Sequence, residues 1–262
     1  MTATRTESSD ATTEADLGAG EGARPWRTLL LQPAIILLVL AGFLVWLFTA
    51  DLTTTESRTL SWGTLFPMFV EHLRLTGVAA LVVILIAVPL GILLTRGRVK
   101  RAAGPVTAVA NVGQAAPAIG LIVLLAMWLG FGWRTAVVSL VAYAVLPVLR
   151  NTMVGLTGVD PRVVEAGRGM GMSALAVLWR VELPLAVPVI LAGIRTALVL
   201  LVGTATLAAF IDGGGLGELI VTGVNLYLPS VLNSGALLVA LLALLVDWVG
   251  RVVEHIARPR GL

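Results

Sequence analysis

Long stretches without Asp, Glu, Lys or Arg alternate along the chain with short segments in which those residues gather. A helix needs about 20 consecutive apolar residues to cross the hydrocarbon core of a bilayer. The pattern therefore predicts six membrane spans, at about residues 29–49, 70–95, 106–130, 134–155, 184–211 and 229–250. We expect an all-α, polytopic membrane protein whose membrane domain occupies residues 28–256.

The composition agrees with this prediction and excludes several classes of function. Hydrophobic residues make up 58% of the 262 residues, charged residues make up 13%, and the mean hydropathy is +0.97; soluble domains hold about 25% charged residues. With no cysteine and only two histidines, the chain offers little for a metal site and nothing for thiolate chemistry. A net charge of +3 is too balanced to suggest a nucleic-acid partner. A soluble enzyme is excluded, and we expect no catalytic residue, cofactor or metal on this chain.

The basic residues predict how the spans are oriented, because Lys and Arg are enriched in cytoplasmic connections. They gather before the first span, in the second and fourth connections, and in the C-terminal tail. The fifth connection has only Asp212 and Glu218. We therefore expect both termini to be cytoplasmic, in an inner or plasma membrane. Residues 1–27 are rich in Thr, Ala, Ser, Gly and acidic residues without apolar periodicity, which predicts a disordered cytoplasmic tail.

The fourth connection, residues 156–183, is unusually long for a link between two adjacent spans. Asp160 followed by Pro161 predicts the start of a short helix, with the carboxylate as its cap and the proline at its first position. Gly169 and Gly171 permit a sharp bend after it, and Ser173 is placed to cap a second short helix. From spacing alone, an amphipathic hairpin resting on lipid headgroups and a surface for a protein partner both stay open.

A spaced motif in this connection favours the protein partner. It consists of Glu165-Ala166-Gly167, three further residues, Gly171, nine residues, Val181, one residue and Leu183-Pro184. The pattern resembles the EAA loop of permease subunits in ATP-binding-cassette importers, with Gly167 and Val181 as small apolar departures. The resemblance implies a coupling helix that contacts a separate ATPase subunit. Because the chain has no GxxxxGK[ST] sequence, we expect ATP and Mg to bind to that ATPase.

The resemblance extends over about residues 70–255 and becomes more specific. The stretches LPVLRNT, GVDPRVVEAGRGMG, VELPLAVPVILAGIRTA and IDGGGLGELI are similar to those of osmoprotectant importer permeases for glycine betaine, choline and carnitine. This implies a type I importer permease, a second permease copy that is identical or a sister chain, and an extracytoplasmic solute-binding protein. Two alternatives are an importer permease for another small solute, such as an amino acid or sulfonate, and a secondary transporter.

Charged residues inside the spans suggest a structural contact. Arg195 lies about ten residues inside the fifth span, and Asp247 lies near the cytoplasmic end of the sixth. A charge at that depth is costly unless it is paired or close to an interface. We expect these two residues to pair and to join the last two spans, although snorkelling of both side chains to the headgroups is an equal alternative.

Several polar residues are candidates for lining a translocation path: Gln114, Pro117, Asn151, Thr204, Thr206 and Asp212. Hydroxyl groups in membrane helices more often bond to a backbone carbonyl or to a neighbouring helix, so helix packing is an alternative role for each. Asp212 stands where the relatives usually have glycine. It is interpreted either as a carboxylate that attracts a cation or as a solvated loop residue.

Overall fold

The computed structural model describes residues 25–257, which form helices and the turns between them. The long helices are α2 (Pro25–Thr49), α4 (Trp62–Leu94), α7 (Trp133–Thr157), α10 (Leu183–Thr204) and α12 (Pro229–Ala257). The shorter elements are α3 (Thr54–Thr59), the 3₁₀ turn η1 (Gly97–Ala102), α5 (Ala103–Ala115), α6 (Ala118–Leu129), α8 (Pro161–Gly169), α9 (Ala174–Val177), the π-helical turn η2 (Leu178–Glu182), the 3₁₀ turn η3 (Ala205–Ile211) and α11 (Gly217–Asn225). Most of the predicted tail, residues 1–24, lies outside the described residues.

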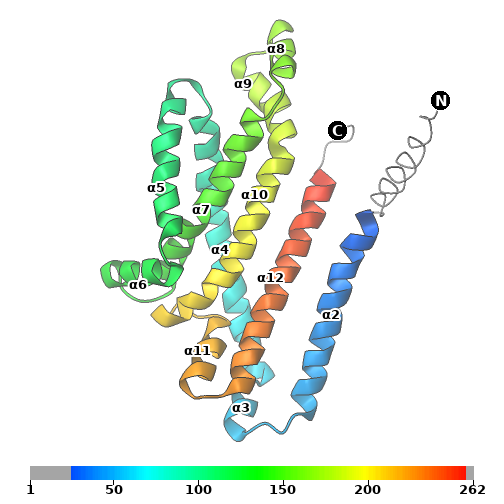
Figure 1. Cartoon of the computed structure of the whole chain (residues 1–262), viewed down its shortest axis with the longest axis vertical. Coiled ribbons are helices and arrows are strands. Elements are labelled where there is room, and N and C mark those ends of the chain that lie inside the picture. The colour runs from blue at the N-terminus through cyan, green and yellow to red at the C-terminus, as the bar shows by residue number, and fades with distance from the viewer. Residues whose placement is uncertain (1–24, 258–262) are drawn as a thin grey trace, which may run out of the picture.

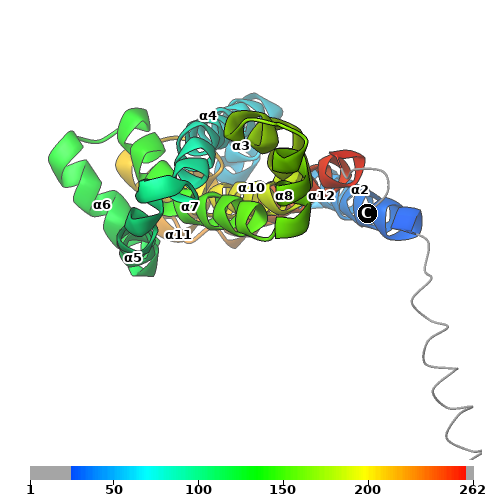
Figure 2. The same cartoon turned by 90° about the horizontal axis from the view of Figure 1, so that it is seen from above.

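The helices lie side by side in an elongated bundle (Figure 1). Helices α4, α7 and α10 form its core, where Leu75, Val83, Leu140, Leu149 and Leu201 are almost completely buried. Helix α12 packs on α10, and α2 lies beyond α12 at one edge, while α5 and α6 lie at the opposite edge (Figures 1 and 2). Five described helices are long and apolar enough to cross a membrane, or six if α5 and α6 together form one span. The predicted all-α membrane architecture is confirmed.

Small residues let the core helices approach closely. A Cβ atom at Gly155 on α7 would lie 3.1 Å from the carbonyl oxygen of Ala186 on α10. One at Gly193 on α10 would overlap the Cβ of Asn151 on α7. Both helices therefore depend on the absence of a side chain at these crossings, because interiors packed to crystal-like density have no space for an added methyl group.

The stretch expected to form the third span, 106–130, is not a single helix. Helix α5 ends at Ala115 and α6 begins at Ala118, and the two are bent by 99° relative to each other. Pro117 causes the break, because a proline disfavours helical geometry in the residue before it, and Ala116 has an extended backbone with ψ of 142°. With 13 residues, α5 is about 20 Å long, which is too short to cross a hydrocarbon core of about 30 Å.

Other boundaries differ from the expected ones in smaller ways. Helix α4 begins at Trp62, ahead of the predicted start at 70, and its 33 residues make it about 50 Å long. The fifth predicted span, 184–211, consists of α10 and the tighter turn η3. The described ends of the chain, Pro25 and Ala257, lie at the same end of the bundle as α8 and α9 (Figure 1).

Candidate functional site

The α8–η2 segment, residues 161–182, projects from the end of the bundle (Figure 1). Its first helix begins as its sequence predicts: the carboxylate of Asp160 accepts a hydrogen bond of 2.9 Å from the backbone N–H of Arg162, and Pro161 occupies the first turn. The cap satisfies a backbone donor that the helix itself leaves free. Local chemistry therefore fixes where α8 starts.

The turn that follows α8 also has the expected form. Helix α8 ends at Gly169, and Gly171 has a φ of +83°, a conformation that a glycine adopts without steric cost. The hydroxyl of Ser173 then accepts a hydrogen bond of 3.2 Å from the backbone N–H of Ala176 and caps α9. Two short helices joined by a tight turn result.

The α8–η2 segment folds against itself through Gly167. This residue is buried, and a Cβ built on it would lie 3.5 Å from the side chain of Val177 and 3.7 Å from that of Val181. An added Cβ would therefore be in ordinary contact with both side chains, and α8 packs on α9 and η2 at this residue. Leu183 and Pro184, which close the spaced motif, form the first turn of α10.

The outer surface of the α8–η2 segment is exposed and mixed in character. Glu165 and Ala166 are exposed. Four apolar side chains are exposed as well: Val163, Met170, Leu175 and Trp179. Exposed apolar side chains are typical of surfaces that contact another protein or a membrane. The sequence motif thus lies on an exposed segment that is available for such a contact.

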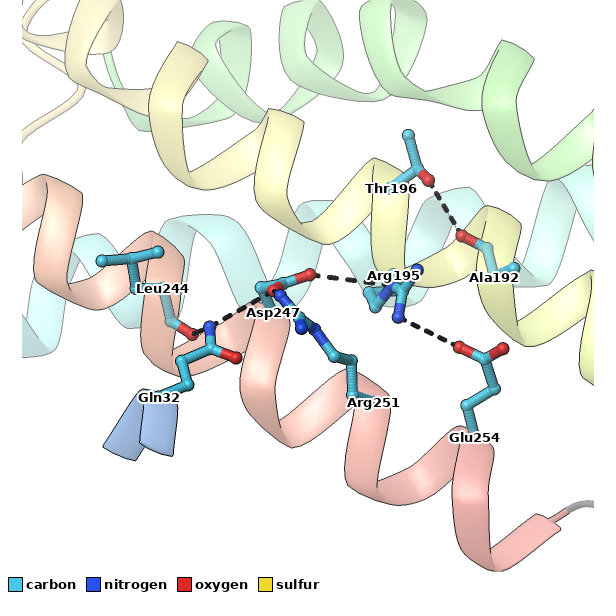
Figure 3. A network of polar contacts seen from close by, with 8 residues as sticks. All are labelled: Gln32, Ala192, Arg195, Thr196, Leu244, Asp247, Arg251 and Glu254. Carbon is cyan, nitrogen blue, oxygen red and sulfur yellow. Dashed lines mark hydrogen bonds and ion pairs between the residues drawn. The ribbon is translucent and has the colours of Figure 1, made fainter. Parts of the chain in front are cut away.

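Charged side chains join α10 to α12 (Figure 3). The Nε atom of Arg195 lies 3.7 Å from Oδ1 of Asp247, and its Nη1 lies 3.1 Å from Oε2 of Glu254. Between those two carboxylates α12 has Gly250, where a Cβ would lie 2.7 Å from Cγ of Arg195. The structure brings together the pair expected from the sequence and adds Glu254 to it.

Asp247 also has partners beyond Arg195 (Figure 3). Arg251 donates to it over 3.0 Å from Nε, and the side-chain amide of Gln32 donates over 3.3 Å. The same amide lies 3.0 Å from the carbonyl oxygen of Leu244. The network therefore connects α2, α10 and α12, and the contribution of Gln32 could not be predicted from the pattern of residues along the chain.

The polar residues proposed for a translocation path bond mostly to their own helices. Thr204 donates to the carbonyl of Leu200 over 2.8 Å, and Thr206 donates to that of Gly203 over 2.7 Å. Asn151 donates to the carbonyl of Pro147 over 2.8 Å. Gln114 is half-buried in the last turn of α5, and Pro117 precedes α6. No hydrogen bond among the described residues joins any two of the six candidates.

Asp212 begins a glycine-rich loop, residues 212–217, at the end of the bundle opposite α8. It is exposed and adopts a left-handed backbone with φ of 56°. Glu218, which follows the loop, has a raised pKa because it is partly buried and because the carboxylates of Glu71 and Asp212 are nearby. The three carboxylates therefore share one electrostatic environment.

Helix α4 anchors this loop by two contacts that sequence reasoning missed. The carboxylate of Glu71 accepts the backbone N–H of Gly215 over 3.2 Å, and Nδ1 of His72 accepts that of Leu216 over 3.3 Å. The Nε2 atom on the other side of the His72 ring lies 3.0 Å from the carbonyl oxygen of Val202. An Nδ1 that accepts leaves Nε2 to donate, so the arrangement fits a neutral imidazole that joins the loop to α10.

A third missed contact lies at the end of the bundle near α8. Arg96, which follows α4, forms an ion pair with Glu182, the last residue of η2. Glu182 occupies the position of the spaced motif between Val181 and Leu183. One sequence feature could have revealed this pair. Glu182 is an acidic residue directly in front of a long apolar span, and a basic connection is available to supply its partner.

Family comparison places the chain among transport proteins. Residues 87–258 match the model of a family described as the binding-protein-dependent transport system inner membrane component. The chain is 44% identical over 192 residues to the glycine betaine/carnitine/choline transport system permease protein OpuCB of Bacillus subtilis (strain 168), covering 73% of this chain and 88% of that relative. It is 38% identical over 205 residues to the osmoprotectant import permease protein OsmW of Salmonella typhimurium, covering 76% and 94%. The family resemblance expected from the motifs is confirmed.

Solved structures agree with this result. The chain is similar to a chain of the MetNI methionine ABC transporter in an inward-facing conformation, with a TM-score of 0.66, 25% identity and coverage of 74% of this chain and 96% of that chain. It also shares its fold with an amino acid ABC transporter, with a TM-score of 0.64, 18% identity and coverage of 78% and 100%. The helical arrangement is that of importer permeases.

Proposed function

The chain belongs to the family of binding-protein-dependent transport system inner membrane components, and on that premise we propose that it is the permease subunit of an ATP-driven importer of quaternary ammonium osmoprotectants. Glycine betaine, choline and carnitine are the solutes we expect. One observation carries the proposal: the spaced motif of residues 165–184 forms a capped, two-helix projection with an exposed mixed surface. The names of the relatives support the solute class.

The α8–η2 segment is the docking surface for a separate ATPase in this proposal. Glu165, exposed on α8, is available to pair with a basic groove residue, and the small exposed side chain of Ala166 permits close approach of the ATPase, while Gly167 is buried inside the segment. Met170 and Trp179, both exposed, would become buried in the contact. ATP and Mg would bind to the ATPase, which supplies the energy for moving this segment.

Orientation and assembly follow from the same surface. An ATPase is cytoplasmic, so the end of the bundle with α8, Pro25 and Ala257 would face the cytoplasm, in agreement with the basic connections. The glycine-rich loop 212–217 would then face the extracytoplasmic side, where a solute-binding protein delivers its load. A second permease, identical or sister, would complete the path at the interface between the two copies.

Reconstitution tests this proposal. We expect proteoliposomes with the full-length chain, the ATPase, the partner permease and the binding protein to take up labelled glycine betaine only when ATP is present. Uptake by the chain alone would contradict the importer assignment and favour a secondary transporter. Uptake of an amino acid or a sulfonate in place of betaine and choline would contradict the solute class alone.

A charge reversal tests the docking surface. Glu165→Lys should abolish ATP-dependent uptake and release the ATPase in a pull-down, because it places a positive charge opposite a basic groove. Asp51→Lys is the matched control, since Asp51 is an exposed acid at the opposite end of α2 from Pro25. Unchanged uptake by Glu165→Lys would show that Glu165 takes no part in coupling to the ATPase.

A further inference from the structure

Glu182 is a buried acid at the base of the α8–η2 segment. Its side chain is 7% exposed and pairs with Arg96, whose side chain is 34% exposed. The two residues are 86 positions apart, so the pair joins the end of α4 to the start of α10. Among the described residues, the guanidinium has no other hydrogen-bond acceptor, and its Nε is buried without one. The carboxylate of Glu182, which is almost completely buried, therefore depends on Arg96 to compensate its charge.

The backbone at Glu182 is unusual as well. The backbone N–H of Leu183 bonds to the carbonyl of Leu178, five residues earlier, which makes η2 a π-helical turn. Such a turn takes in one more residue than an α turn and is frequent at functional sites. The extra residue changes the direction in which side chains leave the helix before and after it. The turn therefore belongs to the geometry that places Glu182 toward Arg96.

The α8–η2 segment is suited to move as one body. Gly167 of α8 is packed on Val177 of α9 and Val181 of η2, and η2 continues without a break into α10. A displacement of α8 therefore reaches α10 through the backbone. Helix α4 has no such covalent connection to the segment. Its side chains Val88 and Ile92 pack with Leu183 of α10 against one apolar cluster, and among the described residues the Arg96–Glu182 pair is the ion pair that adds to this packing.

We propose that the Arg96–Glu182 ion pair is a positioning contact that transmits movement of the α8–η2 segment to α4, so that α4 and α10 move together during the transport cycle. This inference rests on the proposed function as an importer subunit. Without the pair, apolar packing alone links α4 to α10, and α4 follows the movement of α10 less closely. The assembled transporter then moves less solute for each ATP hydrolysed.

The test measures uptake of labelled glycine betaine and ATP hydrolysis in the same proteoliposomes, with the complete complex. Coupling free energies between sites are commonly worth about 5- to 150-fold. We expect Glu182→Gln and Arg96→Gln each to lower the uptake per ATP hydrolysed by about tenfold. The exchanged pair Arg96→Glu/Glu182→Arg should recover most of the ratio. Arg98→Gln, which removes an exposed charge from the same connection, is the matched control and should leave the ratio unchanged.

A bridging experiment separates positioning from folding, because both states are measured on one preparation. The chain has no cysteine, so Arg96→Cys/Glu182→Cys introduces a unique pair that a flexible bismaleimide can join. The unbridged double variant should hydrolyse ATP with little uptake, and the bridged form should regain uptake. Normal coupling before bridging, or loss of hydrolysis and uptake after it, would overturn the proposal. A wild-type complex without ATP-dependent uptake would instead refute the proposed function itself.

Discussion

Helix α10 packs against α7 through small residues and against α12 through charges. On the α7 side, Gly155 and Gly193 allow the two backbones to approach closely. On the α12 side, Arg195 reaches past Gly250 to Asp247 and Glu254. The first interface is specified by shape and the second by charge. A shape-specified contact tolerates no added volume, whereas a charge-specified contact tolerates volume better but fails when one sign changes.

Reversing the charge at Arg195 should have the largest effect on the α12 side. Arg195→Asp places a third carboxylate beside Asp247 and Glu254, and we expect it to lower the free energy of unfolding by about 3 kcal/mol. Adding Asp247→Arg should restore part of the loss, because opposite charges face each other again. Denaturant unfolding in detergent micelles measures both variants. If the second change restores nothing, Arg195 and Asp247 do not act as a pair.

An added methyl group at Gly193 should disrupt the packing of α10 against α7. Gly193→Ala places its Cβ on the Cβ of Asn151, which has no flexible end to move away, so we expect a loss of about 2 kcal/mol. Gly203→Ala is the control on the same helix, since nothing lies within 4 Å of its added Cβ. Equal unfolding midpoints for the two variants would show that the α7–α10 crossing is not closely packed.

The substitution Gly250→Ala tests whether the α12 side of α10 tolerates added volume better than the α7 side does. The added Cβ would meet Cγ of Arg195 at 2.7 Å, but a long side chain is able to shift by a few tenths of an ångström. We expect a loss of about 1 kcal/mol, smaller than at Gly193. A larger loss at Gly250 than at Gly193 would reverse the assignment of shape and charge to the two faces.

A pH titration tests the surroundings of the glycine-rich loop, which are independent of the two faces of α10. The pKa of Glu218 is raised by burial and by Glu71 and Asp212, so the folded chain binds this proton more tightly than the unfolded chain does. The free energy of unfolding should therefore fall slightly as pH rises from the ordinary pKa of glutamate through the raised value. Glu218→Gln should remove that slope in unfolding measured between about pH 4 and pH 8. An unchanged slope would assign the titration to another group.

The sequence predicted contacts between residues close together in the chain best. The cap at Asp160, the turn at Gly171 and the cap at Ser173 follow from rules that act within four residues. The start of α12 near Pro229 and the segment between α7 and α10 were also predicted close to their observed bounds. The Arg195–Asp247 contact was reachable because charges inside apolar spans are few and need partners.

Contacts that depend on tertiary packing were not predictable in the same way. The roles of Glu71 and His72 as acceptors for the glycine-rich loop require knowing which helix lies beneath that loop. Glu182 and Arg96 are 86 positions apart, and several basic residues of the same connection were equally eligible partners. Pro117 marked a possible break in the third span, but apolar composition alone does not distinguish a straight span from a bent one.

The bend between α5 and α6 has a consequence for hydration. The last carbonyls of α5 and the first amides of α6 have no partner within their own helices, and a backbone group left bare in hydrocarbon costs several kcal/mol. The neighbourhood of Ala116 therefore faces water or another protein surface, and lipid tails are excluded from it. A single proline, Pro117, thus determines which surroundings this part of the chain requires.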